Sequence, residues 1–86
     1  MYEEFLKELN IENNGSSGII VNIDNSEDFA RFYALLSSSK LVKLDETASA
    51  TSYENTVLTY RGKGFYVKLF ANLDKDIYKL VIEKDN

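Results

Sequence analysis

The chain has 86 residues, of which 14 are acidic and 10 are basic, so its formal net charge is −4. It contains no cysteine and no histidine, which excludes disulfides, thiolate metal sites and the usual general base near neutral pH. Its length suits one domain, predicted over residues 1–86, and its 44% hydrophobic content is typical of a protein with a core.

The first half of the chain is predicted to contain two short helices with a strand between them. Apolar residues at helical spacing mark the first helix: Tyr2, Phe5, Leu6 and Leu9. Asparagine and glycine residues then interrupt the pattern, and a β-branched run over 19–23 predicts a strand. The polar residues 24–28 favour a helix start. The apolar stripe of the second helix is Phe29, Phe32, Tyr33 and Leu36, and serines 37–39 mark its end.

The last third of the chain is predicted to form a three-strand meander. A turn at Gly62 and Lys63 pairs Tyr60 with Phe65, and a second turn pairs Phe65 with Ile82. Both hairpins place the same large side chains on one face. A slip of one residue in either hairpin would turn that whole set to the opposite face.

These elements predict an α+β fold of order α-β-α-β-β-β-β, with a mainly antiparallel sheet and both short helices packed on it. A further strand is expected over residues 41–44. The polar segment 45–54 is interpreted as a loop, with an edge strand as the alternative. One option for the segment from Ile19 to Leu44 is a right-handed crossover between two parallel strands.

The residues that alternate with the buried set face the other way, and five of these seven are apolar or aromatic. We call them the outer face: Val57, Tyr66, Lys68, Phe70, Ile77, Lys79 and Val81. A solvated sheet face is usually more polar, so either the first helix or segment 45–54 covers this face, or it binds a partner. In the second case Tyr66 and Phe70 are the expected anchors, and Lys68, Ile77, Lys79 and Val81 complete the predicted site.

A second candidate surface is acidic, because residues 1–28 carry seven acids and one base. Four glutamates are predicted to form the solvated face of the first helix: Glu3, Glu4, Glu8 and Glu12. Such a face is either simply hydrated, or a decoy of nucleic acid that binds a basic groove on another protein.

The outer face also fits single-stranded nucleic acid, since Tyr66 and Phe70 would stack bases while neighbouring lysines meet phosphates. The acidic net charge and the presence of only two arginines weigh against this alternative.

No catalytic residue, metal ligand or cofactor is predicted. Asn72, Asp74, Asp76 and Glu83 have the oxygen-ligand spacing of an EF-hand loop, but Ile77 replaces its sharp-turn glycine. The serines have no histidine to deprotonate them.

The leading expectation is a small non-enzymatic protein-binding module whose partner is another protein or a second copy of itself. The chain has neither a signal-peptide pattern nor an apolar run of about 18 residues, so a cytoplasmic location without membrane insertion is expected. Lysine outnumbers arginine 8 to 2, which we interpret as the codon bias of an AT-rich bacterial or phage genome. The chain has the general character of small bacterial or phage accessory proteins, some of which act as inhibitors.

Overall fold

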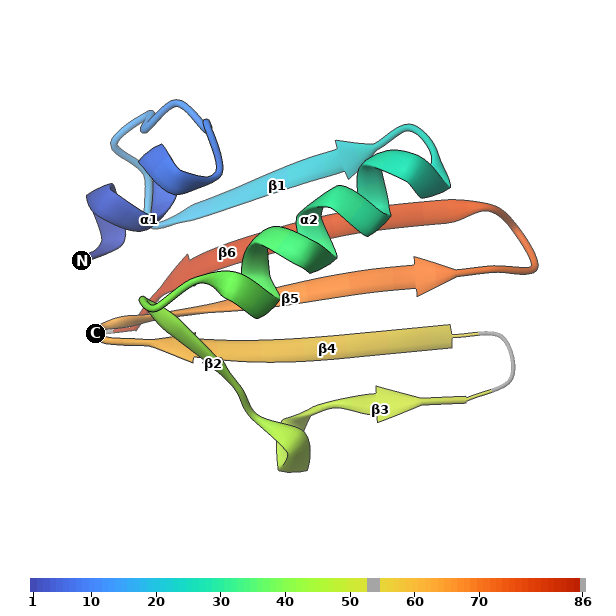
Figure 1. Cartoon of the computed structure of the whole chain (residues 1–86). Coiled ribbons are helices and arrows are strands. Elements are labelled where there is room, and N and C mark those ends of the chain that lie inside the picture. Colours follow the sequence, from blue (N-terminus) through green and yellow to red (C-terminus); the bar gives the residue numbers. More distant parts are fainter. Residues whose placement is uncertain (53–54, 86) are drawn as a thin grey trace.

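The computed structural model describes residues 1–52 and 55–85 and has an α+β fold, with two helices and a six-strand antiparallel sheet (Figure 1). The helices are α1 (Tyr2–Glu8) and α2 (Ser26–Ser38), and one 3₁₀ turn is η1 (Glu46–Ala48). The strands are β1 (Gly18–Ile23), β2 (Val42–Leu44), β3 (Ala50–Thr51), β4 (Asn55–Gly62), β5 (Phe65–Asn72) and β6 (Ile77–Lys84). The predicted fold class is confirmed, including the C-terminal meander.

Helix α1 ends in a left-handed cap. Asn10 has a φ of +57°, its N–H bonds to the carbonyl of Lys7, and the N–H of Ile11 bonds to the carbonyl of Leu6. These two bonds form a Schellman motif, for which asparagine is a suitable residue after glycine. The chain therefore reverses at once, which brings Ile11 against the core and confirms the predicted stripe from Tyr2 to Leu9 as buried.

Helix α2 begins where the capping side chains predict. Asn25 accepts a hydrogen bond of 2.8 Å from the N–H of Asp28, which satisfies one of the free backbone donors of the first turn. Leu36 is fully buried, whereas Tyr33 is 48% exposed. The predicted apolar stripe is therefore only partly covered, because α2 lies over part of the sheet and leaves the β4 side more open (Figure 1).

The sheet has the order β1-β6-β5-β4-β2, with β3 beside β4, and every pair is antiparallel. The option that the segment from Ile19 to Leu44 joins two parallel strands is confirmed, because four antiparallel steps separate β1 from β2 and the two therefore run in the same direction without pairing. β1 and β2 lie at opposite ends of the strand order, and α2 spans the sheet between them (Figure 1). β1 pairs instead with β6, from the other end of the sequence.

The predicted register of both hairpins is wrong by two residues. Tyr60 lies opposite Val67 and not Phe65, while Phe65 lies opposite Gly62 and Lys84. The first turn falls on Lys63 and Gly64, where Gly64 takes a φ of +84° that favours glycine. A shift of two residues preserves the face of each side chain, so the predicted inner set is nevertheless buried.

The core lies between the helices and the inner face of β4, β5 and β6. Phe65 is fully buried, with its ring centroid 5.0 Å from that of Phe5 and 5.8 Å from that of Tyr2. On α2, Phe29 packs against Tyr78 at 5.3 Å. Both helices therefore cover the same face of the sheet, as predicted.

Residues 45–52 contain more regular structure than the predicted loop. Asp45 caps η1 by accepting hydrogen bonds from the N–H groups of Thr47 and Ala48, and β3 then pairs with β4 through Ala50 and Thr51. The alternative of an edge strand is confirmed for these two residues. Residues 53–54 of the predicted loop lie outside the described part of the chain.

Candidate binding surface

Neither helix covers the outer face, because both pack on the side of Phe65 and Tyr78. The alternative that the first helix covers the outer face is therefore wrong. Residues 45–48 cover the outer face at Thr59, whose hydroxyl donates a 2.8 Å hydrogen bond to the carbonyl of Ala48 and is fully buried. Elsewhere β3 extends the sheet sideways, and the predicted outer residues remain half-buried or exposed.

One cross-strand row of the outer face is centred on Tyr66, between Arg61 and Glu83. The Tyr66 hydroxyl donates a 2.5 Å hydrogen bond to the Glu83 carboxylate, which raises the pKa of Tyr66. The ring also lies 5.8 Å from the Lys68 ammonium. Tyr66 is consequently held in one orientation by its neighbours.

Arg61, the remaining member of that row, is paired with Asp45 at 2.6 Å. Its guanidinium hydrogen bond is the main reason that the pKa of Asp45 falls to about 2. The charge of Arg61 is thus balanced by its own chain.

A second row is centred on Phe70, with Val57 on one side and Lys79 on the other. The Lys79 ammonium lies 5.1 Å from the Phe70 ring centroid. Ile77, at the end of the same face, is 56% exposed. Register therefore brings Phe70, Lys79 and Ile77 together as a mixed apolar and cationic patch.

The row between these two contains Lys68, Val81 and Ile20. Ile20 belongs to β1 and is 66% exposed, and sequence reasoning did not place it on this surface. Its alternation with Ile19 and Val21 was a usable signal, but the pairing of β1 with β6 was not foreseen.

The cations of the outer face are largely free of carboxylate partners. The ion pairs among residues 1–52 and 55–85 join Met1 to Glu4, Arg31 to Asp28 and Arg61 to Asp45. Within that part of the chain, the ammonium groups of Lys68 and Lys79 make none. A patch of positive charge therefore stands on a protein whose net charge is −4.

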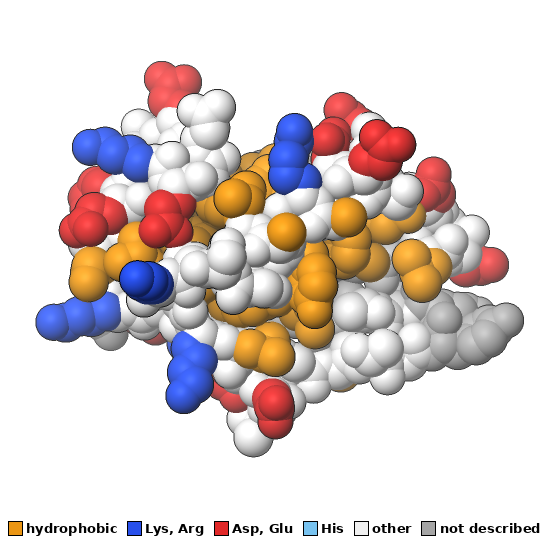
Figure 2. All heavy atoms as spheres, in the orientation of Figure 1, with side chains coloured by type: hydrophobic (Ala, Val, Ile, Leu, Met, Phe, Trp, Pro, Cys, Tyr) orange, Lys and Arg blue, Asp and Glu red, His pale blue; other side chains and the backbone are white. Residues whose placement is uncertain are grey.

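The predicted acidic face is divided by the end of α1. Glu3, Glu4 and Glu8 are exposed on the helix, where the Glu8 carboxylate accepts a 2.6 Å hydrogen bond from the Ser39 hydroxyl. Glu12 lies beyond the Schellman motif, so the four glutamates do not share one helix face. Carboxylates gather over α1 and the start of α2 on the helical side of the molecule (Figure 2).

The helical side also has an apolar groove that sequence reasoning missed. Figure 2 shows hydrophobic side chains along α2 and toward β4. Two hollows of about 320 and 330 Å³ share Tyr33 as a lining residue, one reaching Leu44 and the other Leu73. All three side chains are at least 40% exposed. The groove results from the incomplete cover that α2 gives to the inner face.

Within the described ranges, no group of three or more acidic side chains is placed to hold a metal ion. No helix in that part of the chain is long and apolar enough to cross a membrane. Comparison with known proteins finds no matching family model, no matching curated protein and no matching solved structure.

Proposed function

We propose that the protein is a non-enzymatic binding module that docks an acidic partner protein on its outer face. The observation that carries the proposal is the uncovered sheet surface on which Tyr66 and Phe70 alternate with Lys68 on β5 and adjoin Lys79 on β6. Aromatic side chains at the centre of such a surface are the usual anchors of protein interfaces.

The anchors are already ordered before any partner arrives. Tyr66 is fixed by its hydrogen bond to Glu83, and Phe70 lies half-buried between Val57 and Lys79. Ordering a side chain on binding costs about 0.5–1.5 kcal/mol, so fixed rings retain more of their contact energy.

Charge favours an acidic partner over a second copy of the chain. A symmetric pair formed through the outer face would bring Lys68 and Lys79 of one copy close to the same residues of the other. Juxtaposed like charges cost free energy, whereas carboxylates on a partner complement them and accelerate association. We therefore expect the protein to be monomeric when alone.

Single-stranded nucleic acid is the second candidate, because Tyr66 and Phe70 lie on one strand with Lys68 between them. Binding of this kind weakens steeply as salt is added, since each phosphate contact releases counterions. A fluorescent oligothymidine titrated at two salt concentrations separates this candidate from the first.

The test of the proposed function is affinity capture from a lysate of the native cell, with and without nuclease. The outer face is altered by combining Tyr66→Ser with Lys68→Glu, and Tyr33→Ser on the opposite side serves as the matched control. Proteins held by the wild type and the control, lost by the outer-face variant and unaffected by nuclease, are the expected result. Equal capture by all three chains, or complete loss after nuclease, contradicts the proposal.

A further inference from the structure

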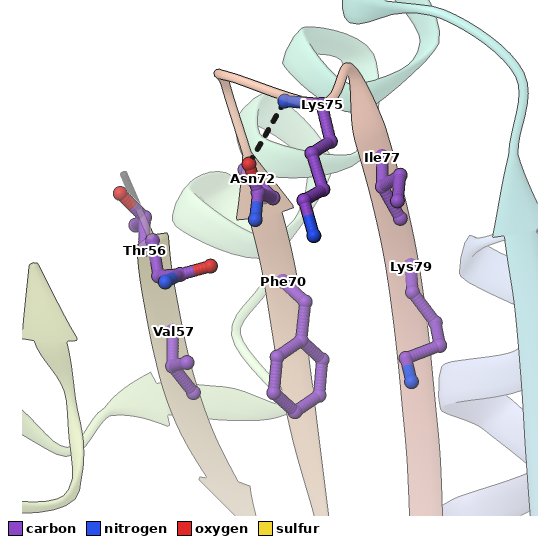
Figure 3. Close-up of a pocket in the computed structure, with 9 residues that line it drawn as sticks. Thr56, Val57, Phe70, Asn72, Lys75, Ile77 and Lys79 are labelled. Carbon is purple, nitrogen blue, oxygen red and sulfur yellow. Dashed lines mark hydrogen bonds between the residues drawn. The ribbon is translucent and has the colours of Figure 1, made fainter. Parts of the chain in front are cut away.

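A hollow of about 380 Å³ opens on the outer face at the end nearest the turn between β5 and β6 (Figure 3). Its apolar lining comes from three neighbouring strands, and its cationic lining from the turn and β6. The residues used below are Val57, Phe70, Asn72, Lys75, Ile77 and Lys79. The volume lies near the lower end of known ligand pockets, which suits one large side chain.

The turn directs Lys75 into this hollow. The Asn72 side chain accepts a 3.0 Å hydrogen bond from the backbone N–H of Lys75, and Asp76 adopts a positive φ of +56°. The Lys75 side chain then extends back along the hairpin toward Phe70 (Figure 3). Two ammonium groups, those of Lys75 and Lys79, therefore border one apolar floor.

Neither ammonium group has a carboxylate within ion-pair distance among the residues that the structure describes. The floor is made by Phe70 between Val57 and Ile77, and Ile77 is 56% exposed. An apolar floor bordered by unpaired cations complements a ligand that is apolar at its centre and anionic at its edges.

We infer that this hollow takes one large apolar side chain, flanked by carboxylates, from an extended acidic segment of the partner protein. The inference rests on the proposed function and names the part of the partner that is recognised. Lys75 and Lys79 would each face a carboxylate, while the apolar side chain covers the Phe70 ring.

Within residues 1–52 and 55–85, no exposed large apolar side chain has a carboxylate on both sides in sequence. The two glutamates of α1, Glu3 and Glu4, stand between Tyr2 and Phe5. Tyr2 is 6% exposed and Phe5 is fully buried in the core, so presenting either would require α1 to detach. The occupant is therefore a different protein.

The experiment uses the full chain and a defined probe, a blocked short peptide in which a phenylalanine is flanked by glutamates. Amide and side-chain NMR shifts are followed during titration, and the same peptide with glutamines in place of glutamates is the matched probe. We expect shifts concentrated at Val57, Phe70 and Ile77, and tighter binding of the glutamate peptide.

Lysine variants then test the two cations. Lys75→Gln and Lys79→Gln should each weaken the glutamate peptide by about two- to fivefold, the range of solvent-exposed ion pairs. Lys40→Gln removes an exposed lysine that does not line the hollow and should leave the affinity unchanged. Thermal melts verify that each variant is folded.

Three results overturn the inference: no shifts at the hollow, equal binding of the glutamine peptide, or an oligothymidine that binds the hollow more tightly than the glutamate peptide. If the peptide fails while the Tyr66→Ser and Lys68→Glu chain still loses its captured proteins, the outer face binds a partner elsewhere. If the chain with Tyr66→Ser and Lys68→Glu also captures the same proteins from the lysate as the wild type, the proposed function has failed as well.

Discussion

Phe65 and Tyr66 are neighbours on β5, and replacing each in turn with alanine measures how differently the two faces of the sheet contribute to stability. Phe65 is fully buried with two aromatic rings within 5.8 Å, so its truncation is expected to cost about 3–5 kcal/mol. Tyr66 loses a half-exposed hydrogen bond to Glu83 and contact with Lys68, which together are worth about 0.5–1.5 kcal/mol.

Urea unfolding followed by circular dichroism measures both free energies. A chain of this length has a total stability of roughly 4–13 kcal/mol, so Phe65→Ala will leave the protein close to unfolding. Phe65→Leu, with an expected loss of about 1–2 kcal/mol, keeps the comparison measurable if the alanine variant does not fold. A loss for Tyr66→Ala as large as that for Phe65→Ala would refute the reasoning, because the outer face would then be part of the core.

Three further substitutions test local features of the fold. Gly62→Ala should cost about 1–3 kcal/mol in urea unfolding, because its Cβ would lie 2.3 Å from the buried ring of Phe65, and an unchanged midpoint would contradict that contact. Asn25→Ala removes the N-cap of α2 and should cost about 1 kcal/mol by the same assay, while Asn25→Ser should restore most of the loss. Asp45→Asn should lower the melting temperature near neutral pH through weaker pairing with Arg61. Because the pKa of Asp45 is lowered from 3.8 to about 2, the difference in melting temperature between wild type and Asp45→Asn should be full above pH 3.8 and vanish as the pH falls through 2. A difference in melting temperature that stays constant over that range argues against the ion pair.

The faces of the meander were predictable from sequence because side chains alternate with a period of two. Phe65, Val67 and Leu69 are buried as expected, and Tyr66 and Phe70 lie on the opposite side. The register was not predictable by the same means, since a shift of two residues leaves each side chain on its face.

Two features could not be predicted from the sequence: the exact position of the turns and the pairing of strands that are distant in the chain. Gly62 and Gly64 both permit a tight turn, and the choice of Gly64 depends on Phe65 packing over Gly62 across the hairpin. Nothing local indicated that β1 pairs with β6, so Ile20 was not assigned to the outer face. The hollow beside Lys75 likewise depends on the backbone of the turn, which sequence spacing alone does not define.

The pairing of β1 with β6 has a consequence for synthesis of the protein. Gly18 pairs with Glu83, so β1, the first strand of the sheet in sequence order, remains without its partner until β6, the last strand of the sheet, has been synthesised. Until then Val21 can contact Phe32 and Leu35 of α2, but the backbone of β1 has no partner strand, although β4 and β5 are already able to form a hairpin. Pairing between strands that are distant in sequence is slow, and β1 stays accessible to chaperones until it has formed.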